Sequence, residues 1–89
     1  MIISKEKKDK IAEQILAFLY QKNPLAQFTS YIAKEVARDE EFVKEILEGL
    51  KEKGLIVEIK KNPLGVAYSR RSRWKLSSGT YDFYKKIQN

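Results

Sequence analysis

The chain has 89 residues, of which 43% are hydrophobic and 34% are charged, and its formal net charge is +6. This length predicts one domain, and the composition provides enough apolar side chains for a core. The sequence contains neither Cys nor His, which excludes disulfides, thiolate metal ligands and catalysis by histidine.

No apolar run approaches the roughly 20 residues that a membrane-spanning helix needs. The N-terminal residues lack the apolar region of a signal peptide. No glycine-rich phosphate loop is present, and the carboxylates form no pair in which one pKa would be expected to shift. We therefore expect a cytoplasmic protein that is not an enzyme, binds no cofactor or metal ion, and does not enter a membrane.

The first predicted helix begins after Ser4, whose hydroxyl can cap it. Its apolar residues recur at the spacing of one helical face: Ile11, Ile15, Phe18 and Leu19. Pro24 disfavours helical backbone at Asn23 and ends this helix.

A second, short helix is expected after Thr29 or Ser30, either of which can cap it, with apolar Ile32, Ala33 and Val36. The helix breaks at Ala37 and Arg38, and Asp39 then suits the N-cap of a third helix over residues 39–53. The apolar positions of the third helix are Val43, Ile46, Leu47 and Leu50. Gly54 is typical of the left-handed residue that ends a helix.

After Gly54 the apolar period changes from helix to strand. Residues 55–60 alternate, with Leu55, Val57 and Ile59 on one face and Ile56, Glu58 and Lys60 on the other. A turn at residues 62–65 leads to a returning strand over 66–76, in which Trp74 and Leu76 alternate with Arg73 and Lys75.

Two registers of this hairpin stay open. Leu55 can pair with Leu76 and Val57 with Trp74, or a tight turn at 62–65 can shift the pairing by about four residues. Ser77 and Ser78 are then expected to cap a last helix over residues 79–88.

Charge is separated along the chain. Residues 60–75, hereafter the basic segment, contain six Lys and Arg and no acid, whereas residues 39–53 contain six acids and three lysines. Solvated surfaces usually mix both signs. The separation therefore indicates that the basic segment binds a polyanion, although a strand edge kept basic to prevent edge pairing is the alternative.

The order and spacing of these elements resemble the winged helix-turn-helix family, the small DNA-binding domains of many bacterial and archaeal transcriptional regulators. The resemblance rests on residues 32–56, with Lys53-Gly54-Leu55-Ile56 at the exit into the wing, and on the ending at residues 73–84. It implies an α+β fold with three helices, a β-hairpin wing and a short C-terminal helix. Residues 1–89 would form this single domain.

The chain departs from that family pattern at two places. Exposed positions of the third helix, which in the family usually carry donors to phosphates and base edges, are here mostly acidic: Glu40, Glu41, Phe42, Lys44, Glu45 and Glu48. Carboxylates repel phosphate, so it stays open whether this helix enters the major groove. Ala37 occupies a turn position where the family often has Gly, and we expect it to keep a negative φ.

The resemblance therefore implies a regulator that binds double-stranded DNA mainly through the basic segment. The candidate nucleic-acid-binding residues are Lys34, Lys44, Lys60, Lys61, Tyr68, Arg70, Arg71, Arg73 and Lys75. Trp74 could stack on a base, but its alternation with Arg73 and Lys75 favours the core.

Two alternatives concern other partners. The acidic face of the third helix, formed by Glu40, Glu41, Glu45 and Glu48, could dock a basic protein, and the domain could instead bind RNA or associate with the ribosome. The abundance of Lys, Glu and Ile is a weak indication of an archaeal-like thermophile.

The last helix carries more apolar side chains than a small core readily covers. Tyr81, Phe83, Tyr84 and Ile87 could form the interface of a homodimer, or they could pack over the first helix. We favour a homodimer, because two half-sites are often read by paired domains.

Overall fold

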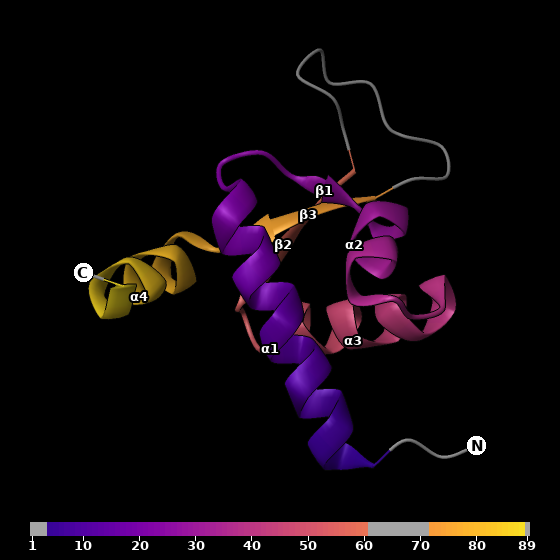
Figure 1. Cartoon of the computed structure of the whole chain (residues 1–89). Helices are drawn as coiled ribbons and strands as arrows, with labels where there is room; N and C mark the ends of the chain where they lie inside the picture. Colours follow the sequence, from indigo (N-terminus) through magenta and orange to yellow (C-terminus); the bar gives the residue numbers. More distant parts are fainter. Residues whose placement is uncertain (1–3, 61–71, 89) are drawn as a thin grey trace.

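The computed structural model describes residues 4–60 and 72–88, and these form four helices and a small sheet. The elements in chain order are α1 (Lys5–Lys22), β1 (Gln27–Phe28), α2 (Thr29–Val36), α3 (Glu40–Glu52), β2 (Ile56–Ile59), β3 (Arg73–Leu76) and α4 (Ser78–Gln88). Figure 1 shows α1 crossing the sheet, with α2 and α3 on one side of it and α4 at the opposite end of the molecule. The predicted α+β class is confirmed.

The predicted core is largely confirmed. Its buried side chains come from α1, α2, α3 and the two longer strands: Ile11, Ile15, Leu19, Ile32, Ala33, Val43, Leu47, Leu50, Ile56, Trp74 and Leu76. Phe18, Val36 and Ile46 lie at its margin and are partly buried. Within the described part of the chain, no helix combines the length and apolar character that crossing a membrane requires.

The predicted helix caps at Ser4 and Asp39 are confirmed. Ser4 Oγ accepts a hydrogen bond from the Lys7 amide, and the Asp39 carboxylate accepts from the amides of Glu41 and Phe42. Each cap satisfies amides that have no partner inside the first helical turn.

Both caps predicted for α2, Thr29 and Ser30, are wrong. Phe28 is the N-cap and provides no side-chain hydrogen bond, and Thr29 is already helical. The Thr29 hydroxyl instead accepts a hydrogen bond from Trp74 Nε1 at 2.8 Å. A tertiary contact with a buried indole therefore uses the hydroxyl that sequence analysis assigned to a local cap.

Helices α2 and α3 end in the same hydrogen-bond pattern. The Arg38 amide donates to the Ala33 carbonyl and the Ala37 amide to that of Lys34. After α3, the Leu55 amide donates to the Leu50 carbonyl and the Gly54 amide to that of Lys51. This pattern requires a left-handed residue after the helix.

The left-handed residue is Gly54 after α3, with φ of 76°, as predicted. After α2 it is Ala37, with φ of 56°. The expectation of a negative φ at Ala37 is therefore wrong, because the two closing hydrogen bonds hold an L-residue in a conformation that disfavours its Cβ.

The three-stranded antiparallel sheet has the order β1-β3-β2, and its first strand was not predicted. In the hairpin, Ile56 pairs with Leu76 and Glu58 with Trp74. This excludes the four-residue shift and lies one residue away from the other expected register. Partners across an antiparallel pair share a face, so a shift of one residue exchanges the two faces of β2.

The expected pairing of Leu55 with Leu76 and of Val57 with Trp74 is consequently wrong. Ile56 is in the core, whereas 40% of Val57 is exposed. Glu58 shares the inner face with Trp74. The buried indole and Leu76 fix which partners turn inward, and the alternation in β2 alone fits either choice.

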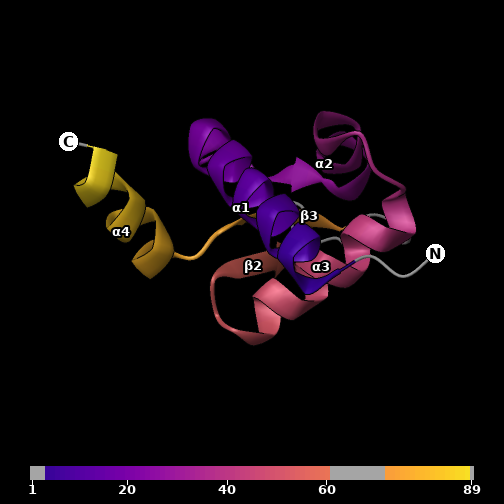
Figure 2. The same cartoon turned by 60° about the horizontal axis from the view of Figure 1, so that its bottom comes forward.

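The last helix begins at Ser78, one residue earlier than predicted, and of the two expected caps Ser77 has this role. The Ser77 hydroxyl accepts a hydrogen bond from the Thr80 amide and shares another with the Thr80 hydroxyl at 2.9 Å. Figures 1 and 2 both show α4 at the edge of the molecule, beyond the end of β3. Its contact with α1 is aromatic, since Tyr20 lies 5.5 Å from Tyr81 and 5.6 Å from Tyr84 between ring centroids.

Candidate nucleic-acid interface

The structure describes five of the nine candidate nucleic-acid-binding residues. Lys60, Arg73 and Lys75 belong to the basic segment and lie in or beside the sheet, while Lys34 and Lys44 are exposed on α2 and α3. The remaining candidates lie outside the described residues: Lys61, Tyr68, Arg70 and Arg71.

The outer face of the sheet carries two of these cations. Arg73 and Lys75 alternate with the buried Trp74 and Leu76, so they lie on the face turned away from the core. Arg73 pairs with Phe28 across the strands, and its guanidinium carbon lies 5.9 Å from the centre of the Phe28 ring. This contact holds a delocalised cation against an aromatic face.

Glu58 lies at the other side of the hairpin, and only 5% of its side chain is exposed. Its carboxylate is 2.8 Å from Lys51 Nζ in the last turn of α3 and 3.8 Å from Lys60 Nζ. The Ser72 hydroxyl donates a hydrogen bond to the other carboxylate oxygen. One acid therefore contacts a residue of α3 and the residues that directly follow β2 and precede β3.

The electrostatics of Glu58 follow from these partners. Burial alone would raise its pKa, but the hydrogen bonds from Lys51 and Ser72 and the charges of Lys51 and Lys60 outweigh burial and hold the pKa below its usual value. The same hydrogen bond raises the pKa of Lys51. Both groups are therefore charged at neutral pH.

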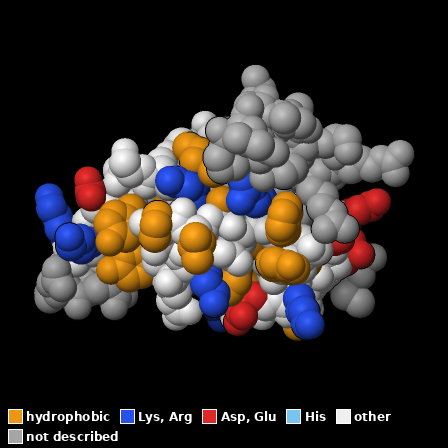
Figure 3. All heavy atoms as spheres, turned by 90° about the horizontal axis from the view of Figure 1, so that it is seen from above, with side chains coloured by type: hydrophobic (Ala, Val, Ile, Leu, Met, Phe, Trp, Pro, Cys, Tyr) orange, Lys and Arg blue, Asp and Glu red, His pale blue; other side chains and the backbone are white. Residues whose placement is uncertain are grey.

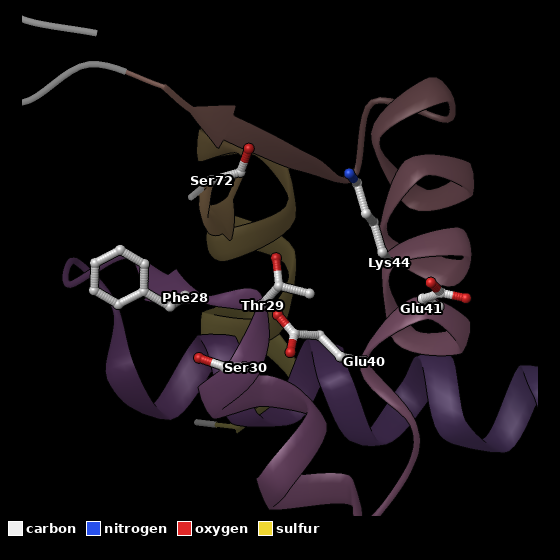
Figure 4. Close-up of a pocket in the computed structure, with 7 residues that line it drawn as sticks. All are labelled: Phe28, Thr29, Ser30, Glu40, Glu41, Lys44 and Ser72. Carbon is white, nitrogen blue, oxygen red and sulfur yellow. The ribbon is translucent and has the colours of Figure 1, made fainter. Parts of the chain in front are cut away.

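A hollow of about 330 Å³ lies where the first turns of α2 and α3 meet the start of β3. Figure 4 shows Glu40 turned toward Thr29 and Ser30, with Lys44 on the α3 side and Ser72 near the strand. Its lining residues are Phe28, Thr29, Ser30, Glu40, Glu41, Lys44 and Ser72. The hollow thus brings two exposed carboxylates beside one of the candidate cations.

The acidic face of α3 has the position that sequence analysis predicted. Glu40, Glu41 and Glu45 are exposed, and Glu48 is half-buried. The helix dipole favours negative charge in the first turn, so Glu40 and Glu41 stabilise α3 locally. The same charges oppose the approach of phosphate.

The four candidate dimer residues of α4 divide into two pairs. Tyr81 and Tyr84 pack on Tyr20 within the same chain, and burial raises the pKa of Tyr84. Phe83 and Ile87 are 61% and 59% exposed. Viewed from above, hydrophobic side chains gather at the α4 end of the molecule (Figure 3).

No protein-family model matches the chain, and no curated protein is similar to it in sequence. Solved structures are similar in fold. S. aureus MepR in complex with DNA matches with a TM-score of 0.74 and 21% identity, covering 93% of this chain and 65% of MepR. MepR in its DNA-binding conformation matches at 0.70 and 20%, covering 88% of this chain and 54% of MepR.

A Lactococcus lactis ZitR mutant in apo form also matches, at a TM-score of 0.70 and 20% identity, over 93% of this chain and 58% of ZitR. The chain therefore spans between 54% and 65% of the length of these three proteins. Identity at this level carries the architecture alone. The chain has the winged helix-turn-helix fold that its sequence pattern implied.

Proposed function

We propose that this domain binds double-stranded DNA through the basic segment and acts as a transcriptional regulator. Support comes from the likeness to MepR, which has been solved with DNA, and from a net charge of +6. A polyanion gains affinity from each cation that replaces a condensed counterion.

The separation of charge between the hairpin and α3 is the observation that carries this proposal. The basic segment contains no acid, and its Arg73 and Lys75 lie on the outer face of the sheet. The first turn of α3 instead presents Glu40 and Glu41. Phosphate is attracted to the first region and repelled by the second, so the hairpin supplies the main contacts, and Lys34 and Lys44 add to them.

The test replaces Arg70, Arg71 and Arg73 together with Ala and measures duplex DNA binding as a function of salt. The slope of log K against log salt is expected to fall by about 0.9 for each phosphate that is no longer neutralised. A matched control replaces Lys5, Lys7 and Lys10 with Ala, because these lysines near the start of α1 carry the same total charge. If both variants bind DNA equally weakly, or both bind like the wild type, the hairpin is not the binding surface.

We also propose that the domain forms a homodimer through α4. Phe83 and Ile87 expose apolar surface on a helix at the edge of the molecule. Next to Phe83, a hollow of about 460 Å³ is lined by apolar groups of Leu16, Leu55 and Tyr84. Contiguous apolar surface of this kind is typical of interfaces.

Replacing Phe83 and Ile87 with Glu is expected to shift the purified domain from dimer to monomer in sedimentation velocity. Leu25→Glu serves as the control, since Leu25 is 69% exposed and belongs to the connection between α1 and β1, not to α4. A wild-type domain that sediments as a monomer at high concentration contradicts the dimer without affecting the DNA-binding proposal.

A further inference from the structure

The carboxylate of Glu58 joins three parts of the chain that are separate in sequence. Lys51 belongs to the last turn of α3, Lys60 directly follows β2, and Ser72 directly precedes β3. Lys60 and Ser72 therefore flank the connection between the two strands. The two ends of that connection are therefore fixed to each other and to α3 through one side chain.

Burying a carboxylate is unfavourable unless it is paired and hydrogen-bonded. Here the burial is offset by two ammonium groups and a hydroxyl, all within the same small network. An apolar residue at position 58, opposite Trp74, would extend the core and would need no polar partners. The carboxylate thus provides directional ties that an apolar side chain lacks, and such ties define one arrangement of the groups they join.

The charge of Glu58 and its geometry act on DNA binding in opposite directions. As a negative charge beside the basic segment, it lowers the affinity for a polyanion. As a group that fixes Lys60 and the start of β3, it keeps cations in a defined orientation, which reduces the ordering that binding requires. The sign of the effect of removing the charge therefore tells the two apart.

We propose that Glu58 is a positioning residue for DNA binding, which holds the base of the hairpin against the C-terminal end of α3. This inference rests on the proposed DNA-binding function. Lys51 and Ser72 are its partners, and neither needs to contact DNA for the arrangement to act. Lys60 contributes both to the network and to the basic surface, and its side chain is exposed.

The first test is Glu58→Gln, which preserves the shape of the side chain and adds one unit of net charge. Weaker binding to duplex DNA, by about tenfold, is expected if removal of the charged ties outweighs the electrostatic gain. The salt slope is expected to fall as well, because misplaced cations neutralise fewer phosphates. Unchanged or tighter binding overturns the proposal.

Glu45→Gln is the matched control. It removes one carboxylate from an exposed position of α3 for which no ion pair is found among the described residues, so it changes the charge alone. Its binding is expected to be slightly tighter than that of the wild type. Titration of duplex DNA with protein at stoichiometric concentration gives the fraction of protein that is able to bind. If the Glu58→Gln protein has a lower active fraction but a wild-type salt slope, the substitution has only reduced folding, and the proposal is overturned.

Ser72→Ala provides a second test that leaves the net charge unchanged and keeps the test decisive if Glu58→Gln does not fold. It removes one tie to the base of β3 and is expected to weaken binding by about threefold. Wild-type affinity in a folded Ser72→Ala protein contradicts the positioning role. If the wild-type domain itself shows no salt-sensitive duplex binding, the proposed function fails, and this outcome is distinct from normal binding by the variants.

Discussion

The two ends of α3 follow the same local rule but have different tertiary roles. Acidic residues occupy its first turn and Lys51 occupies its last turn. The helix dipole favours both placements. Glu40 and Glu41 remain exposed at the first end, whereas Lys51 binds the buried Glu58 at the last. The position of a charge along a helix therefore affects the stability of that helix. A charge links the helix to another element only when it pairs with a residue of that element.

Reversing the charge of the first end should have the largest effect. We expect Glu40→Lys with Glu41→Lys to bind duplex DNA at least about tenfold more tightly, with a salt slope steeper by about 0.9 for each additional phosphate that is neutralised. The control is Glu6→Lys with Glu13→Lys, which makes the same charge change on exposed positions of α1. Equal gains in the two proteins would mean that the first turn of α3 stays away from the DNA.

Removing the tie at the last end should have a smaller effect, on stability. Lys51→Met keeps the aliphatic stem but leaves the buried carboxylate, among the described residues, with Lys60 and Ser72 as its remaining partners. A buried charge that loses its nearest partner destabilises the fold. The control is Lys53→Met, at an exposed lysine two residues later, and we expect Lys51→Met to have the lower Tm. Equal Tm values would show that the Lys51–Glu58 pair does not stabilise the fold.

Low pH should also reduce the stability that the Lys51–Glu58 pair provides at the C-terminal end of α3. The pKa of Glu58 is lower in the folded than in the unfolded state, so its contribution to stability is present above the unfolded pKa of about 4.3 and is lost as the pH falls through the folded pKa. Urea unfolding between about pH 7 and about pH 3 should therefore show a smaller acid-induced fall in the free energy of unfolding for Glu58→Gln than for the wild type. Parallel curves would contradict this assignment.

The turns that flank α3 extend the comparison and carry the smallest predicted effect. Ala37 and Gly54 close the same hydrogen-bond pattern, but only Gly adopts a positive φ without strain. We expect Ala37→Gly to stabilise the fold by about 0.5–1 kcal/mol and Gly54→Ala to destabilise it by about 1 kcal/mol. Chemical denaturation measures both, and a destabilised Ala37→Gly would show that Ala37 is not strained.

The amino-acid sequence was sufficient to predict the features that depend on neighbours along the chain. Ser4 and Asp39 cap their helices and Gly54 ends α3, because a hydroxyl, a carboxylate or a missing Cβ acts within one helical turn. The helical period also identified most of the core, including Ile15 and Leu47. The winged helix-turn-helix architecture followed from the order of these local signals.

Long-range packing selected which side of each element turns inward where the local pattern fitted more than one answer. Both faces of β2 contain apolar residues, so pairing with Trp74 and Leu76 selected Ile56 and buried Glu58. The indole of Trp74 likewise donates a hydrogen bond to the Thr29 hydroxyl. Tyr20 packs against Tyr81 and Tyr84, and Phe83 and Ile87 on the same helix remain exposed. These outcomes depend on contacts between residues far apart in sequence, whose free energies exceed the small local preferences that a single segment can express.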